Sequence, residues 1–212
     1  SYTSHFLGLA KFAVPIQSAL NMSQPCVLGP VILFGVIFGL TGRFFAVSLK
    51  YAKEKMSRFF RNPYARIGLV SIPLAIILTL LYQGRYSGLG TNLIAAAFEG
   101  QTIFAYDWLL KILLTILTLS IGFQGGEVTP LFSIGASLGV IVGGVFGLPP
   151  EVCAALGYAA VFGSATNTLI APVLIGLEVF GTDNAVVLVL VCTVAYLVNG
   201  NRSIYTAQQL EC

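Results

Sequence analysis

The chain has 212 residues, of which 57% are hydrophobic and 9% charged, and its mean hydropathy is +0.89. Soluble domains carry about 25% charged residues, so an ordinary soluble domain is excluded and a polytopic helical membrane protein is favoured. The net charge is +3, and seven of the eleven basic residues lie between positions 43 and 66. This cluster predicts a cytoplasmic segment by the positive-inside rule and argues against a nucleic-acid partner.

The apolar runs, read in chain order, predict an all-α fold. The predicted helices cover residues 6–20, 26–50, 67–83, 92–99, 104–121, 130–147, 151–163, 168–180 and 184–198, and a short helix follows residue 203. Residues 51–66 are predicted as a basic, partly helical cytoplasmic loop. The first predicted helix contains Pro15 and looks interrupted, and the chain starts without Met, so we expect a piece of a longer protein.

Several helices in the second half of the chain are too short to cross a bilayer, which needs about 20 apolar residues. Polar breaks such as "GSATNT" at 163–168 and "NGNRS" at 199–203 separate them. Irregular backbone at membrane depth is tolerated where protein or a watery cavity covers it, and broken helices are typical of transporters. This pattern favours transport over a purely structural role.

Small residues recur every fourth position in the helix predicted over 130–147. Gly135, Gly139 and Gly143 lie on one face of that helix. Such a stripe allows another helix to approach closely in a bilayer.

The stretch "GFQGGEVTP" at 122–130 places one carboxylate, Glu127, between two charge-free windows, 112–126 and 128–150. Thr129 and Pro130 predict a helix start, with Thr as N-cap and Pro as first helical residue. Gly125 and Gly126 allow close backbone approach and unusual dihedrals. Unpaired N–H groups and the helix dipole make such a start an anion site.

Glu127 has two interpretations. In a soluble protein, an acid beside a helix start is stabilised by the dipole and needs no function. An acid inside a membrane is costly, so a functional role is the default hypothesis. The carboxylate competes with a bound anion, and protonation would free the site. This competition favours anion–proton exchange.

The sequence "GGEVTPLFSIGASLG" at 125–139 resembles the chloride-channel/transporter (CLC) superfamily, which has a Gly-x-Phe-x-Pro element at an anion-coordinating helix. Here Val128 replaces Phe, and the Glu-Val-Thr-Pro form is similar to the fluoride/proton antiporter branch. Three further stretches resemble a loop, the dimer-interface helices and the start of the last helix of that family: "GRYSGLGTNLI" at 84–94, "SATNTLIAPVLIGLEVFGTDN" at 164–184 and "NRSIYTAQ" at 201–208.

The resemblance implies that residues 1–212 are the second, C-terminal half of a transporter built from two inverted halves. The family's gating glutamate and its Gly-Arg/Lys-Glu-Gly element belong to the first half. The whole protein would exchange fluoride for protons as a homodimer in the cell's inner (plasma) membrane. The helices predicted over 6–20, 168–180 and 184–198 would meet the second subunit.

The candidate site combines both lines of reasoning. We expect Gly126, Val128, Thr129 and Tyr205 to bind the anion and Glu127 to couple the proton. Tyr205, read from the sequence alone, is an ordinary interface tyrosine, and only the resemblance makes it an anion-coordinating hydroxyl at an inner gate. Asn167 has two predicted roles. It is either the N-cap of the helix that follows it or a residue that lines the pathway.

Enzymatic chemistry has little support in the sequence. The chain has a single histidine, His5, and contains no HExxH, GxSxG, P-loop or Rossmann pattern. We therefore expect no enzyme, no cofactor and no metal. Two alternatives stay open: a chloride/proton exchanger or passive anion channel of the same superfamily, and a non-transporting membrane scaffold.

Overall fold

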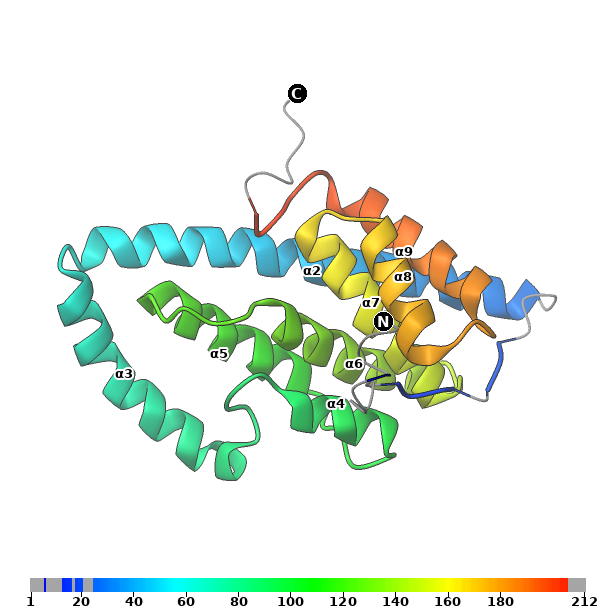
Figure 1. Ribbon diagram of the computed structural model, residues 1–212, viewed down its shortest axis with the longest axis horizontal. Helices are drawn as coiled ribbons and strands as arrows, with labels where there is room; N and C mark the ends of the chain where they lie inside the picture. Colours follow the sequence, from blue (N-terminus) through cyan, green and yellow to red (C-terminus); the bar gives the residue numbers. More distant parts are fainter. Residues whose placement is uncertain (1–5, 7–12, 17, 21–24, 206–212) are drawn as a thin grey trace.

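The computed structural model describes residues 6, 13–16, 18–20 and 25–205, and the regular structure in these ranges is entirely helical (Figure 1). The predicted all-α fold is therefore confirmed. The elements are α2 (Pro25–Phe59), α3 (Pro63–Leu80), the short 3-10 helix η1 (Leu81–Gly84), α4 (Thr91–Phe98), α5 (Asp107–Ile121), α6 (Val128–Val145), α7 (Pro150–Thr166), α8 (Ile170–Phe180) and α9 (Ala185–Asn199).

Three stretches of the described residues are long and apolar enough to cross a bilayer. They are Val27–Phe59, Pro63–Gly84 and Val128–Val145. The helices α8 and α9 are apolar but have only 11 and 15 residues, fewer than the roughly 20 that a full crossing needs. The predicted mixture of spanning and shorter helices is present.

Helix α7 forms the centre of the core. Every residue from Val152 to Thr166 is buried, as expected of a helix that is apolar all round. The helices α2, α6, α8 and α9 pack around it, so its C-terminal end is a fixed point for the chain segments near it.

Helices α6 and α7 approach each other at backbone distance. A Cβ atom at Gly135 would overlap the carbonyl oxygen of Gly157, and one at Gly139 would overlap the carbonyl of Cys153. The predicted small-residue stripe therefore lies in this contact. This close contact holds α6 at a fixed position on the buried helix α7.

The helix predicted over 6–20 is wrong for residues 13–16 and 18–20, which are not helical. The amides of Val14 and Ile16 donate instead to the carbonyls of Val179 and Phe180, at 2.8 and 3.2 Å. Pro15 explains the difference, since proline has no N–H and disfavours helix at the residue before it. Residues 7–12 of this prediction, and the short helix predicted after 203 from residue 206 on, lie outside the described residues.

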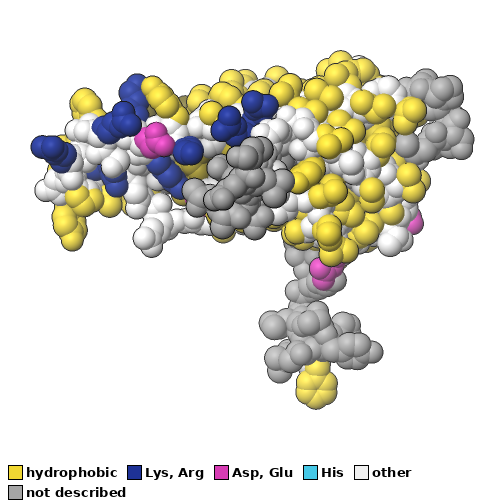
Figure 2. Space-filling view, turned by 90° about the horizontal axis from the view of Figure 1, so that it is seen from above, with side chains coloured by type: hydrophobic (Ala, Val, Ile, Leu, Met, Phe, Trp, Pro, Cys, Tyr) yellow, Lys and Arg dark blue, Asp and Glu magenta, His cyan; other side chains and the backbone are white. Residues whose placement is uncertain are grey.

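The segment 51–66 is more helical than predicted. Helix α2 continues to Phe59 and α3 begins at Pro63, so only residues 60–62 connect them. No Gly or Pro occurs between residues 51 and 59, whereas Asn62 caps α3 by accepting from the amide of Tyr64 at 3.0 Å. Figure 2 shows Lys and Arg side chains gathered at this end of the molecule, while hydrophobic side chains dominate the rest of the face. The cytoplasmic location stays a prediction.

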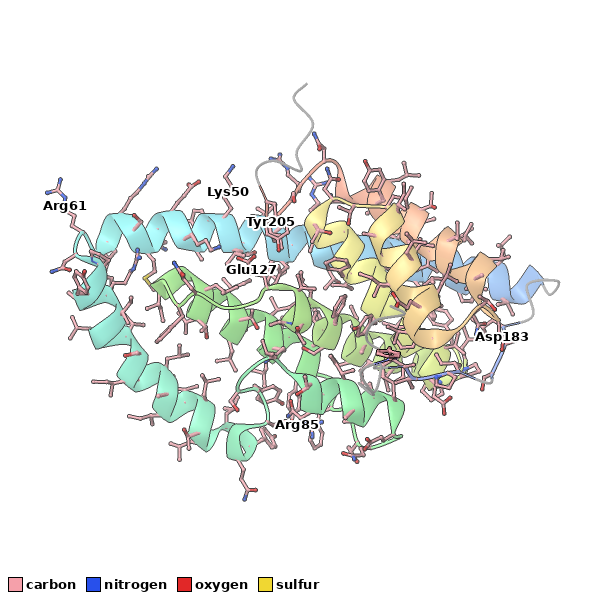
Figure 3. All side chains as sticks on the ribbon, in the orientation of Figure 1. Lys50, Arg61, Arg85, Glu127, Asp183 and Tyr205 are labelled. Atoms are coloured by element: carbon pink, nitrogen blue, oxygen red, sulfur yellow. The ribbon has the colours of Figure 1, made fainter. Side chains whose placement is uncertain are left out.

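A buried polar network fastens the 85–90 loop to α5. The carboxylate of Asp107, which has no exposed surface, accepts from Arg85 Nη2 at 2.8 Å and from the Tyr86 hydroxyl at 2.5 Å. Burial, and then the hydrogen bond to Asp107, raise the pKa of Tyr86, so its phenol remains a neutral donor. Lys111 Nζ donates to two carbonyls of the same loop, those of Tyr86 and Gly88. Arg85 lies well away from Glu127 in Figure 3.

Candidate functional site

The site begins where α5 ends. Gly122 closes α5 in the left-handed region, with φ at 112°, and α6 starts at Val128, so Glu127 occupies the N-cap position. The carbonyl of Glu127 accepts the amide of Leu131 at 3.3 Å. The N-cap role predicted for Thr129 is therefore wrong, because the helix begins one residue before it and its hydroxyl lies within the first turn.

The first turn of α6 offers few backbone donors. Val128 and Thr129 carry N–H groups that are too early in the helix for intrahelical bonding, and Pro130 has none. Gly125 and Gly126 have no heavy atom within 4 Å of a Cβ position, and neither has positive φ. The unusual dihedrals predicted for these glycines do not occur. Their contribution is an uncrowded approach to the helix start.

Glu127 is the centre of the site. Its side chain is only 17% exposed and forms an ion pair with Lys53, whose Nζ lies 3.0 Å from Oε1. The Tyr205 side chain lies beside the same carboxylate in Figure 3, and Glu127 helps to raise the pKa of the Tyr205 phenol. Three segments distant in sequence therefore meet at one carboxylate: the end of α2, the start of α6 and the segment after α9.

The surroundings of Tyr205 keep its phenol protonated. Burial, followed by the charge of Glu127 and the hydrogen bond to it, raise the pKa of Tyr205 above its usual value. A raised pKa means that the neutral hydroxyl persists at any pH below the usual range for tyrosine, near 10. Tyr205 is therefore a hydrogen-bond donor at neutral pH, facing a carboxylate acceptor.

Tyr205 is held in place by bonds to the end of α7. The Ser203 hydroxyl donates to the carbonyl of Thr166 at 3.0 Å, and the Ile204 amide donates to the carbonyl of Ala165 at 2.9 Å. The amide of Tyr205 in turn donates to Ser203 Oγ at 3.0 Å. These contacts fix an irregular segment on the buried helix, so the hydroxyl reaches Glu127 from a defined direction.

Asn167 belongs to the same support. It ends α7 in the left-handed conformation, with φ at 55°, so the predicted N-cap role is wrong. Its side-chain amide donates to Asn201 Oδ1 at 2.9 Å, and its Oδ1 accepts from Asn199 Nδ2 at 3.1 Å. The asparagine cluster joins the ends of α7 and α9. A pathway-lining role for Asn167 stays a prediction.

The other predicted anion ligands do not gather around Tyr205. Gly126 lines a cavity of about 260 Å³ that Lys111 also borders, whereas Thr129 lines another, of about 360 Å³, with Phe132 and Tyr158. Val128 packs partly buried against the apolar core. Of the predicted site residues, Glu127 and Tyr205 therefore lie together. Gly126, Val128 and Thr129 lie on other sides of the start of α6.

Sequence reasoning missed Lys53 and the residues that support Tyr205. Lys53 is one of seven basic residues in a short stretch, and nothing in the local pattern distinguishes it from its neighbours. Ser203 and Asn199 act through partners more than 30 residues away in sequence. Their polarity beside an apolar helix was the only available signal.

These features define a class of protein. Long apolar spans, short interrupted helices and a mostly buried carboxylate at a helix start are typical of membrane transport proteins. The chain belongs to the voltage gated chloride channel family, whose model matches residues 3–200. The predicted membership of the CLC superfamily is confirmed.

Two relatives refine this result. A chloride/fluoride channel protein of Pseudomonas syringae pv. tomato (strain ATCC BAA-871 / DC3000) is 35% identical over 190 residues, which cover 85% of this chain and 41% of the relative. The crystal structure of a CLC-type fluoride/proton antiporter shares 52% sequence identity and superimposes with a TM-score of 0.95, over 99% of this chain and 53% of the other. The chain therefore spans about half the length of these relatives or less.

Proposed function

We propose that this chain is the second, C-terminal membrane half of a transporter that exports fluoride in exchange for protons. The observation that carries the proposal is the mostly buried Glu127 carboxylate at the start of α6, with the Tyr205 side chain beside it. The 52% identity to a CLC-type fluoride/proton antiporter supports the choice of ion and of exchange mechanism.

The chemistry follows from the groups that meet there. A small, strongly hydrated anion must find close donors that replace its water. The Tyr205 hydroxyl is such a donor, and the Glu127 carboxylate lies beside it. A proton on Glu127 would remove the negative charge that competes with fluoride and release the hydroxyl. Proton uptake and anion binding are then linked at one place.

The complete transporter is proposed to contain further parts. By the same resemblance, the N-terminal half carries the gating glutamate, two subunits form a homodimer, and the protein lies in the inner membrane. Residues 1–212 supply the inner hydroxyl, the proton-coupling acid and the anion-facing helix start, with Gly126, Val128 and Thr129 as further anion contacts and Asn167 as pathway lining.

The test uses the full-length protein reconstituted in liposomes, with a fluoride gradient and a pH-sensitive dye. Glu127→Gln removes the titratable group but keeps its shape, so we expect fluoride-driven proton uptake to fall by about tenfold or more. The matched control is Glu151→Gln, an exposed acid in the first turn of α7, which should leave uptake unchanged. Normal uptake in the Glu127 variant would remove its assigned role.

Chloride is the second candidate substrate, because one relative is described as a chloride/fluoride channel protein. Parallel efflux measurements with fluoride-selective and chloride-selective electrodes separate the two ions. Flux without proton movement would indicate a passive channel. Absence of either flux in the complete protein would favour a non-transporting scaffold.

A further inference from the structure

The ion pair between Lys53 and Glu127 joins an exposed part of α2 to the mostly buried start of α6. Lys53 lies on the extension of α2 and is 45% exposed, whereas Glu127 is 17% exposed at the start of α6. Ion pairs at a protein surface contribute little to folding stability. A mostly buried carboxylate is different, because loss of its cation leaves the charge uncompensated. Loss of the Lys53 charge therefore acts directly on the Glu127 carboxylate.

The contact is specific to one lysine of the basic cluster. Lys53 Nζ lies 3.0 Å from Glu127 Oε1. Lys55, on the same helix, instead lies over the ring of Tyr51, with Nζ 5.8 Å from the centroid. Two residues along a helix correspond to a rotation of about 200°, so Lys55 cannot share the direction of Lys53. Substitutions at Lys53 and Lys55 can therefore separate the effect of the direct contact with Glu127 from the general electrostatic effect of the basic cluster.

The charge of the pair changes when Glu127 is protonated. With the carboxylate ionised, the lysine and the acid sum to zero. When a proton from the pathway binds a carboxylate oxygen, the acid becomes neutral, Lys53 keeps its own protons, and the pair carries one positive charge. A positive charge beside the inner hydroxyl attracts an anion.

We propose that Lys53 is a positioning residue for proton–anion coupling: its ammonium holds the Glu127 carboxylate against Tyr205 and, once Glu127 is protonated, becomes the charge that draws in the anion. This inference rests on the proposed function and adds a residue to it. Because linkage is reciprocal, the proton tightens anion binding by the same factor by which the anion tightens proton binding.

The other charged groups on the elements around Glu127 form no ion pair with it among the described residues. Helices α6 and α9 contain no charged residue, α7 has Glu151 only, and Asp107 and Lys111 of α5 belong to the network around the 85–90 loop. The remaining groups on neighbouring elements are Arg43, Lys50, Glu54, Lys55 and Arg58 of α2, Arg66 of α3 and Arg202 after α9. Among the residues that the structure describes, Lys53 forms an ion pair with the Glu127 carboxylate, and the Tyr205 phenol has its pKa raised in part by that carboxylate.

The experiment compares three variants of the full-length transporter in liposomes. Lys53→Met removes the charge, Lys53→Arg keeps it, and Lys55→Met removes an equal charge from the same helix without touching Glu127. We expect Lys53→Met to lower fluoride-driven proton uptake about fivefold or more, the lower end of typical coupling between sites. Lys53→Arg should retain most of the uptake, and Lys55→Met should match the wild type.

The pH dependence of fluoride binding, measured by calorimetry at acidic and alkaline pH, tests the coupling directly. A purely structural role of Lys53 would not change this pH dependence. The wild type should bind fluoride more tightly at acidic pH, and Lys53→Met should lose most of this difference. In the Glu127→Gln background, Lys53→Met should not change the pH dependence of fluoride binding further, because the ionisable carboxylate is already absent. It should still weaken fluoride binding at both pH values, because the attracting charge is lost.

The possible failures are distinct. Wild-type uptake and wild-type pH dependence in Lys53→Met would overturn the inference about Lys53. Reduced proton uptake in Glu127→Gln would still support the proposed function in that case. Equal losses in Lys53→Met and Lys55→Met would also overturn it, since the general field of the cluster would then be responsible. No fluoride–proton exchange in the wild type would contradict the proposed function itself.

Discussion

At the scale of single residues, the site is a carboxylate with two different partners. Lys53 offers Glu127 a full positive charge, and Tyr205 offers it a neutral hydroxyl. A cation stabilises the ionised acid, whereas the phenol can donate to either a carboxylate or an anion that replaces it. In the proposed mechanism, the ionised Glu127 carboxylate competes with an anion for this donor.

Removal of the phenol hydroxyl tests this role. Tyr205→Phe keeps the ring but removes the donor, and hydrogen bonds to charged groups contribute about 1.5–3 kcal/mol. We expect fluoride binding to weaken by about tenfold or more, measured by calorimetry on the full-length protein. Tyr64→Phe, at an exposed position on α3, is the control. Equal affinity in both variants would show that the Tyr205 hydroxyl does not contact the anion.

Some of these residues could be predicted from the sequence. Glu127 stands out because an acid with long charge-free flanks is costly in a membrane. Tyr205 was assigned through family resemblance, because a tyrosine near a helix end is common at membrane interfaces. Lys53 was not found, since its partner lies 74 residues away. Thr129 was misplaced because local rules fix helix starts only to within one or two residues.

At the scale of elements, apolar periodicity predicts helices well and their ends poorly. Helix α2 runs to Phe59 because nothing in the basic stretch interrupts it, and charge alone does not end a helix. The segment around Val14 and Ile16 failed as a helix because its backbone bonds to α8. Pro15 is the local signal against the helix, whereas the partner of this segment is a tertiary contact that no local pattern shows. The small-residue stripe succeeded because close packing leaves a clear pattern.

The packing of α6 on α7 gives a stability prediction. Gly135→Ala places a Cβ atom onto the carbonyl of Gly157, and overpacking of this kind costs about 1–3 kcal/mol. We expect a lower thermal unfolding midpoint for the full-length protein in detergent. Gly144→Ala is the matched control on the same helix, because nothing lies within 4 Å of its Cβ position. Alanine at 144 should be neutral or slightly stabilising, and an equal loss at both sites would contradict the close contact.

At the scale of the whole molecule, apolar surface remains uncovered on opposite sides. Helix α3 exposes Leu69 and Leu80, and the α8–α9 pair exposes Ile170, Leu174 and Val186. The two helices of the pair extend along one side of the bundle, with α3 at the far end (Figure 1). Composition predicted such surfaces in general, since a membrane protein presents apolar side chains to lipid or to partners. It did not distinguish lipid from partner, and the assignment of α8 and α9 to a dimer contact came from resemblance.

Cross-linking can distinguish these surfaces. Ile170 and Leu174 are four residues apart and share one face of α8, and both are well exposed. In a variant of the full-length protein with its native cysteines replaced, we expect Ile170→Cys and Leu174→Cys to give covalent dimers with a short bifunctional maleimide in native membranes. A homodimer that meets through α8 and α9 brings two copies of each position close together, because the contact of a two-fold dimer pairs the same surface on both subunits.

The control is Leu69→Cys on α3, which is 65% exposed but lies away from the α8–α9 pair. Collisions between molecules in the membrane would cross-link exposed cysteines on either surface, whereas a specific dimer would cross-link only those on α8. Dimers formed at Leu69 and not at Ile170 or Leu174 would place the subunit contact on α3 and reverse the proposed arrangement. Such a result would leave the Glu127 site intact, because each subunit carries its own copy of the carboxylate, the lysine and the tyrosine.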